Sequence, residues 1–277
     1  MLDEPRSGRL AAWGNALIAG LVSPDDAAQR ITGGDAVHRI TGLPDGAQES
    51  EGPVGLTFGL GRLRALGVRG LRVALPVPGH PLGLTGPAGF NAAAIEAGEA
   101  VLAVGERPLG LVPEVAVAGP EGDASVAVAW RCLPVRDAPP ADVPSLAEAE
   151  RELTEALRTA TEVLTRLDVA GSGPGALAAL ESYRARRTRA VLAPGYPPRA
   201  VRVLETAQRV DALVGIAEGR YGGGGAGAEH GAAVSASAIA GRAEVLRLLG
   251  RTARRAQVAA YNAFVEEAER KRGAGGR

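Results

Sequence analysis

Three polar side chains in a loop rich in proline and glycine are the residues of this chain best placed to bind a small ligand. His80, Thr85 and Asn91 lie in PGHPLGLTGPAGFN (residues 78–91), between a strand-like apolar run and a predicted helix start. Free backbone N–H groups at a helix start can hold an anion. The loop therefore predicts a small-ligand-binding protein or an enzyme, and the alternative is a rigid surface connection with Thr85 and Asn91 as turn or capping residues.

Arginines at helical spacing form a second candidate site in the last third of the chain. At 100° per residue they fall on two helix faces, Arg199, Arg202 and Arg209 on one, and Arg247, Arg251 and Arg254 on the other. Guanidinium groups bind phosphates and carboxylates, so these faces predict an anionic partner such as an acidic protein. Specific nucleic-acid binding is not expected, because a helix-turn-helix pattern and an aromatic stacking platform are both missing. The alternative is pairing within the chain, with the glutamates of 148–162 and the acidic front half.

Other reactive residues exclude several kinds of chemistry. Lys271 is the single lysine and lies in the terminal KRGAGGR, which argues against a Schiff-base or phosphate-loop lysine. Cys132 is the single cysteine, so an internal disulfide and a thiolate metal cage are excluded, and its strand-like surroundings predict a buried, inert thiol. His38, His80 and His230 lack metal-ligand spacing. We expect no catalytic residue, no metal and no cofactor, and Glu96 with Glu99 on a solvated helix face.

The residues around the loop resemble part of an enzyme family. GRLRALGVRGLRVALPV (residues 61–77), followed by FNAAAIEAG (residues 90–98), is similar to the middle of acetyl-CoA-dependent N-acetyltransferases, where a helix and a strand precede an N-x-A-A helix. The resemblance implies an acyl-CoA-dependent transferase in which Asn91 matches the asparagine of that helix. The family has Gln or Arg three residues before the GxG of its pyrophosphate loop, whereas this chain has Leu56 before Gly59-Leu60-Gly61.

The charges of the chain cancel overall but separate along it. Residues 1–170 hold 14 arginines against 22 acidic residues, a net charge of −8, and residues 171–277 hold 16 arginines and one lysine against 9 acidic residues, a net charge of +8. The single lysine among 31 basic residues reflects a high-GC genome of the actinobacterial type, as does the richness in alanine and arginine. The split predicts either halves that attract each other or an anionic partner for the back half.

The front half reads as mixed α/β. Ser23-Pro24-Asp25 is a strong helix start, since a capping serine precedes a proline and acidic residues in the first turn. Leucines at helical spacing favour a helix over a strand at 55–67. We expect helices at 9–21, 24–31, 55–67 and 90–98, and strands at 71–77, 100–104, 109–118 and 124–135, with 43–53 as a polar loop.

The back half reads as helical after a proline-rich linker at 136–144. Ser145 and Glu148 match a capping box at the start of the first helix. Further helices are expected at about 174–192, 197–219 and 232–271, with a glycine-rich loop at 222–231. The expected architecture is a mixed α/β domain (1–135) followed by an antiparallel four-helix bundle (145–271).

Membrane insertion is tested by the longest uncharged run, residues 73–95. Its length would span a bilayer, but its four prolines and four glycines do not permit a helix. We therefore expect a cytoplasmic protein without a membrane partner. Its most favoured function is a non-enzymatic interaction or scaffold role with an unidentified partner, and the alternative is a ligand-binding protein or enzyme using loop 78–91.

Overall fold

The computed structural model describes residues 4–45, 48–49, 52–120, 123–166, 178, 181, 192–219 and 236–275. The chain forms two compact units, which are described separately below. The sheet unit contains Glu4–Val143, Leu192–Pro197 and the chain from Tyr261 onward. The helical unit contains Pro144–Val191 and Pro198–Ala260. None of the described helices combines the length and the apolar character needed to cross a membrane.

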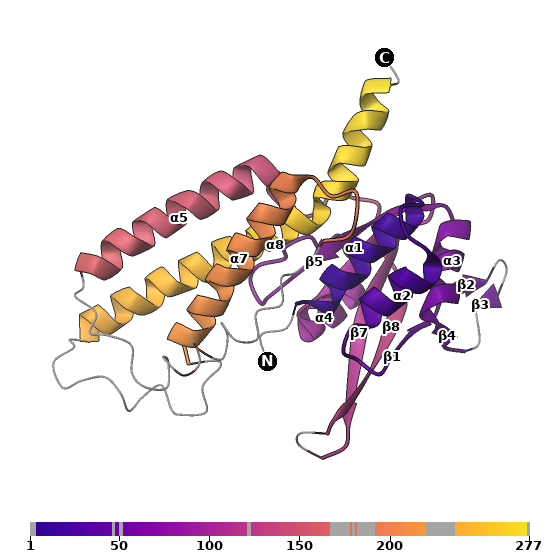
Figure 1. The fold of residues 1–277 in the computed structure, drawn as a ribbon, viewed down its shortest axis with the longest axis horizontal. Coiled ribbons are helices and arrows are strands. Elements are labelled where there is room, and N and C mark those ends of the chain that lie inside the picture. The colour runs from indigo at the N-terminus through magenta and orange to yellow at the C-terminus, as the bar shows by residue number, and fades with distance from the viewer. Residues whose placement is uncertain are drawn as a thin grey trace. The chain divides into compact units, whose positions relative to one another are not determined.

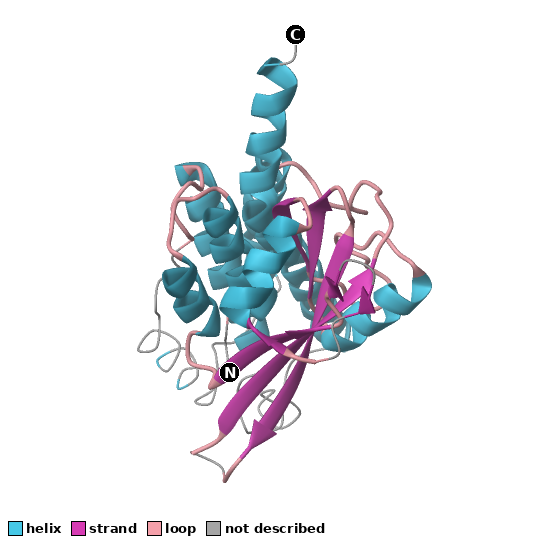
Figure 2. Cartoon of the chain, turned by 90° about the vertical axis from the view of Figure 1, so that its right-hand side faces the viewer, coloured by secondary structure: helices cyan, strands magenta, loops and turns pink. Residues whose placement is uncertain are grey.

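A six-stranded mixed sheet organises the sheet unit (Figure 2). The strand order is β4-β1-β8-β7-β6-β5. β1 runs parallel to β8, and the other neighbours are antiparallel. The strands are β1 (Val37–Thr41), β4 (Val54–Gly55), β5 (Val68–Ala74), β6 (Ala100–Gly105), β7 (Leu109–Ala118) and β8 (Ser125–Pro134), and a separate pair is formed by β2 (Pro44–Asp45) and β3 (Gln48–Glu49).

Four helices belong wholly to the sheet unit: α1 (Arg6–Ile18), α2 (Pro24–Thr32), α3 (Leu56–Ala65) and α4 (Ala88–Ala97) (Figure 1). The start of α2 is capped as its sequence predicts, because Ser23 Oγ accepts a hydrogen bond from the N–H of Asp26 at 3.1 Å. The leucines spaced through 55–67 likewise lie in a helix, α3, and not in a strand.

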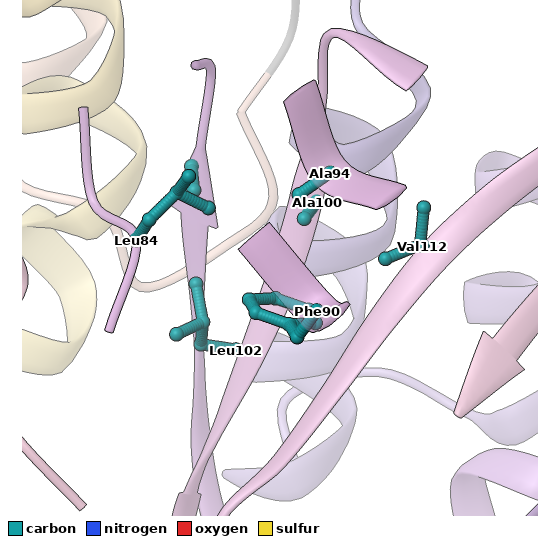
Figure 3. Packing of buried hydrophobic residues seen from close by; sticks show 7 residues of the cluster. Leu84, Phe90, Ala94, Ala100, Leu102 and Val112 are labelled. Carbon is teal, nitrogen blue, oxygen red and sulfur yellow. The ribbon is translucent and has the colours of Figure 1, made fainter. Parts of the chain in front are cut away.

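The sheet buries apolar side chains on both faces. On one face Phe90 and Ala94 of α4 pack with Leu102 of β6 and Val112 of β7 (Figure 3). A glycine at 110 permits this, since a Cβ there would lie 2.3 Å from the Phe90 ring. On the other face Leu71 of β5 packs against α1 at Gly14, where a Cβ would lie 2.5 Å from the Leu71 side chain. The small residues of this alanine- and glycine-rich chain thus let its few large side chains approach the backbone closely.

Two asparagine side chains, and not a further strand, close the outer edge of β5. Asn15 of α1 donates to the C=O of Leu71 at 2.9 Å and accepts from the N–H of Leu71 at 2.7 Å. Asn262 of α8 (Ala236–Gly275) does the same with Val73, at 3.1 Å and 2.6 Å. Both asparagines are buried. Each amide takes the place of one residue of a neighbouring strand, so this edge is closed to further strand pairing.

The helical unit contains α5 (Leu146–Arg166), α7 (Pro198–Ala217) and the part of α8 that ends at Ala260. The predicted capping box begins α5, because Ser145 Oγ accepts from the N–H of Glu148 at 3.3 Å and the Glu148 carboxylate accepts from the N–H of Ser145 at 2.9 Å. Helical spacing places one apolar stripe of α7 inside, at Ala200, Val203, Leu204, Ala207, Val210 and Val214. α5 and α7 pack against each other.

The fold class is confirmed, since a mixed sheet with helices is followed by a helical part. β1 was not predicted from the sequence. The prediction of a loop throughout 43–53 is wrong, because β2 and β3 lie within it. The strand expected at 71–77 is β5 and ends at Ala74. The helix at 174–192, the glycine-rich loop 222–231 and His230 fall outside the described residues, apart from positions 178, 181 and 192. The division into two folding domains at 136–144 stays a prediction.

Candidate functional site

The three predicted ligand-binding residues of loop 78–91 do not converge. His80 is buried, its Nε2 forms an ion pair with Asp142, and its backbone forms a bridge with Val77. Asn91 Oδ1 accepts a hydrogen bond from the N–H of Gly86 at 2.9 Å. Asn91 is therefore a loop brace, as its alternative interpretation predicts, and His80 is held in the loop's own framework.

Thr85 lines a small pocket in the sheet unit. Its Oγ1 is buried and finds no hydrogen-bond partner among the described residues. Arg72, Arg136 and Asp137 contribute charges to the same wall, and the pocket volume is about 40 Å³. Arg72 also forms an ion pair with Glu269 at 2.6 Å. A volume of this size holds about three water molecules, which suits a small ion and excludes an acyl-CoA at this position.

The glycines of the acetyltransferase resemblance lie inside a helix. Gly59 and Gly61 belong to α3, which begins at Leu56, and a Cβ at Gly59 would lie 2.6 Å from the Ile40 side chain. A pyrophosphate loop needs N–H groups that are free of helical bonds, and the N–H groups of residues in a helix interior are already bonded. Gly59 is therefore a packing residue.

The two predicted arginine faces lie on α7 and α8 within the helical unit. Arg199 pairs with Glu150 of α5 at 2.5 Å, and Arg247 pairs with Glu244 one turn away on α8 at 2.6 Å. Arg202 and Arg209 are exposed, and Arg254 is half-buried. Arg251 is exposed and also has an interaction partner. Pairing within the chain thus accounts for part of both faces, and binding of an anionic partner through the rest stays a prediction.

A charged cluster that sequence reasoning missed surrounds Asp35. Its carboxylate accepts from Arg6 at 2.9 Å, from Arg9 at 2.7 Å and from His38 Nε2 at 3.0 Å. The pKa of Asp35 is lowered to about 2, because these hydrogen bonds and positive charges outweigh the effect of burial. Trp130 Nε1–H donates to His38 Nδ1 at 3.2 Å. Since an indole can only donate, this bond fixes His38 as the neutral Nε2–H tautomer.

The tautomer of His38 leads to a pH-dependence prediction. Burial lowers the pKa of His38 below its usual 6.5, although Asp35 opposes that shift. The contribution of neutral His38 to the free energy of unfolding is therefore fully present above about pH 6.5. It falls on acidification, because His38 takes up a proton more readily in the unfolded chain than in the folded chain. Urea denaturation followed at pH 7 and pH 5 should show this loss.

The variant His38→Gln is the matched test, because its amide can still accept from Trp130 and donate to Asp35 but does not titrate. We expect a smaller loss of stability between pH 7 and pH 5 than in the unmodified chain. An identical loss in both proteins would contradict the assignment.

Two further acids are braces in the sheet unit. Glu99 accepts from the N–H of Ser7 at the start of α1 at 2.7 Å, and Glu4 accepts from the Tyr261 hydroxyl at 3.1 Å. Burial raises the pKa of both carboxyl groups. The expectation that Glu96 and Glu99 share a solvated helix face is wrong for Glu99, because α4 ends at Ala97. Neither Glu4 nor Glu99 lines the pocket beside Thr85.

The thiol of Cys132 is buried, as its strand-like surroundings predict. Cys132 of β8 is buried, and burial raises its pKa to about 12, so no thiolate forms near neutral pH. No group of three or more metal-binding side chains occurs in the part of the chain that the structure describes.

The outer half of β7 forms an arm with β8 (Figure 1). β8 pairs with β7 over the whole of Leu109–Ala118, whereas β6 pairs with it only from Leu109 to Leu111. The last five residues of β7, from Glu114 to Ala118, are all exposed. Val115 and Val117 expose 45% and 66% of their surface. Large apolar side chains on an open strand edge are typical of a protein-binding surface.

The hydrogen bonds of β8 show which groups of the arm face outward. Residues of an antiparallel strand alternate between bonding to the partner and facing the other way. The C=O of Val126 accepts from Ala36, on the β1 side, at 2.7 Å, so Val126 faces away from β7. Its opposite residue, Val117, therefore faces away from β8. By alternation Val115 and Pro113 face outward too, and proline fits there because it has no N–H to leave unpaired.

No described residue bonds to the outward N–H and C=O groups of Val115 and Val117. We call residues 113–117 the open edge of β7. Among the candidate sites described above, the open edge of β7 is the one that combines several unused backbone hydrogen-bonding groups with exposed apolar side chains.

Comparison with known proteins places this chain in a family. Its residues 7–143 match the N-terminal domain of Rv1486c-like proteins, and residues 147–258 match the C-terminal domain of the same proteins. The chain belongs to the Rv1486c-like family. It is 33% identical to the uncharacterized protein Rv1486c of Mycobacterium tuberculosis, over 76% of this chain and 82% of that protein. It is 31% identical to the uncharacterized protein ML1804 of Mycobacterium leprae, over 94% and 97% of the two chains. No solved structure shows significant similarity.

In this Rv1486c-like chain the residues of β7 themselves indicate an open strand edge. Pro113 stands inside a run of strand-forming residues, and proline within a sheet is confined to open edges and bulges. The uncharged Val115–Ala118 that follows alternates valine and alanine, which is strand-like on both faces. For the Asp35 cluster no comparable signal exists, because its arginines come from α1 and the Trp130 that bonds to His38 comes from β8, far away in the sequence.

Proposed function

We propose that this Rv1486c-like protein is a cytoplasmic, non-enzymatic interaction protein that binds an extended polypeptide by strand addition along the open edge of β7. The observation that carries the proposal is the row of outward N–H and C=O groups at Val115 and Val117 beside their exposed side chains. Strand addition uses main-chain hydrogen bonds for affinity and alternate side chains for specificity.

Two further observations support a binding role over an enzymatic one. The residues that could do acid–base chemistry, Asp35, His38 and Glu99, are engaged with neighbours inside the sheet unit. The pocket beside Thr85 has room for water or a small ion only. The outer edge of β5, at one end of the sheet, is closed by Asn15 and Asn262, whereas the outward groups at residues 113–117 of β7 have no partner among the described residues.

A proline substitution tests the proposal without disturbing the arm. Val115→Pro removes an outward N–H and leaves the β7–β8 ladder intact, as Pro113 already does two residues earlier. Val115→Thr is the matched control, because it keeps the N–H and the branched side chain. The probe is a fluorescein-labelled peptide of alternating threonine and valine, followed by fluorescence anisotropy.

We expect the Val115→Pro variant to bind the peptide about tenfold more weakly, which is the effect of losing one hydrogen bond. The threonine variant should bind like the unmodified chain. Equal binding by the proline variant would rule out strand addition of the peptide at this edge.

A further inference from the structure

We infer that the occupant of the open edge is the same edge of a second copy of this chain, paired antiparallel about a two-fold axis. The inference rests on the proposed strand addition and names its partner. An antiparallel pair of identical strands is self-complementary, because each copy offers the other the same donors and acceptors. The resulting sheet would continue from one copy into the other.

The outward groups select a register for this pairing. With Ala116 opposite Ala116 of the second copy, Val115 lies opposite Val117 in both directions. The N–H and C=O of each valine then find a partner, and four hydrogen bonds form in total. Pro113 falls outside the bonded residues, so its missing N–H costs no bond and ends the ladder on that side.

The side chains agree with the same register. The exposed Val115 and Val117 of one copy lie beside Val117 and Val115 of the other, which covers apolar surface that is exposed in the single chain. Glu114, the single charged residue of the outer half, lies opposite Ala118 and not opposite a second carboxylate. Its carboxylate also pairs with Arg131 of β8 at 3.2 Å. Charge repulsion between two identical edges is therefore small.

The reach of the arm permits the contact. The pairing of β6 with β7 stops at Leu111, so a partner strand can approach residues 113–117 without displacing β6. In the two views the outer end of the β7–β8 arm extends past the other strands of its sheet (Figures 1 and 2). The interface is short, so we expect a concentration-dependent dimer and not a permanent one.

Cysteine cross-linking of the full chain tests both the partner and the register. The native Cys132 is buried with a raised pKa, so it gives no background reaction. In the inferred register the two Ala116 residues form a close, non-hydrogen-bonded pair with Cα atoms about 4.5 Å apart, within the range of a disulfide. Ala116→Cys should therefore form a covalent dimer under mild oxidation. Ala118→Cys is the matched control, because the two copies of residue 118 lie about 13 Å apart along the strands.

Sedimentation velocity over an about hundredfold range of protein concentration completes the test. We expect the unmodified chain and Val115→Thr to shift from monomer to dimer, and Val115→Pro to stay monomeric. A chain that is monomeric throughout, a dimer that survives Val115→Pro, or cross-linking at 118 in preference to 116 would overturn the inference. If the threonine–valine peptide binds while the chain stays monomeric, the second copy is excluded and strand addition stands. If neither occurs, both proposals fail.

Discussion

Replacing Asn262 with alanine should destabilise the sheet unit by about 2–4 kcal/mol. The Asn262 amide satisfies both the N–H and the C=O of Val73, at 2.6 Å and 3.1 Å, and all of these groups are buried. Without the amide two buried backbone groups lose their partners, at about 1–3 kcal/mol each. Urea denaturation followed by tryptophan fluorescence measures the loss, because both tryptophans, Trp13 and Trp130, belong to the sheet unit.

Asn91→Ala is the matched control for this prediction. Asn91 is half-buried and bonds to one backbone N–H, that of Gly86, so its replacement should cost about 1 kcal/mol. Asn262→Asp should also lower the free energy of unfolding relative to the unmodified chain, because a carboxylate accepts from Val73 N–H but repels Val73 C=O. If Asn262→Ala is no more destabilising than Asn91→Ala, the edge of β5 does not depend on the asparagine.

Replacing Asp35 with asparagine should be the second large effect on stability. Asp35 neutralises Arg6 and Arg9, whose side chains are 22% and 19% exposed, and accepts from buried His38. Its pKa is lowered from 3.8 to about 2. Linkage converts this shift to about 1–2 kcal/mol once screening at the partly exposed guanidinium groups is taken into account. Stability from this carboxylate is complete above about pH 4 and is lost as the pH falls toward 2.

The pH profile separates this effect from that of His38. The unmodified chain should lose stability between pH 4 and pH 2, and Asp35→Asn should lack that component because the amide does not titrate. The contribution of His38 between pH 7 and pH 5 should remain in this variant, because the His38 ring still titrates. Replacement of Asp25, which is exposed at the start of α2, provides a control. If Asp35→Asn leaves the profile below pH 4 unchanged, the cluster does not hold the charge as described.

The sequence predicted the elements whose signals are local. The serine, proline and acidic residues at 23–26 fixed the start of α2, and Ser145 with Glu148 fixed the start of α5, because a helix cap depends on residues within one turn. The apolar burial of Cys132 followed from its strand-like neighbours. β1 was missed because His38 counts as polar in an alternation pattern, and its burial depends on Trp130 of a strand about 90 residues later.

The arrangement of the three candidate ligand-binding residues could not be predicted for the same physical reason. Spacing along a loop shows that His80, Thr85 and Asn91 are close in the chain, but not which way their side chains point. Tertiary contacts decided that Asn91 turns back to Gly86 and that His80 faces Asp142. Thr85 alone reaches the pocket.

By itself the sequence determined the class of the fold, the absence of a disulfide or thiolate metal cage, and the strand that carries Pro113. Composition, single-residue counts and local periodicity suffice for these, because each depends on residues that are neighbours in the chain. Only the tertiary structure decided which strand edges are covered. Asn15 and Asn262 close β5 although they lie 56 and 189 residues away in sequence from their partners on that strand, whereas the pairing of β6 with β7 stops at Leu111 and leaves residues 113–117 of β7 open. Edge coverage depends on which distant segment arrives next to a strand, and that information does not exist in any local pattern.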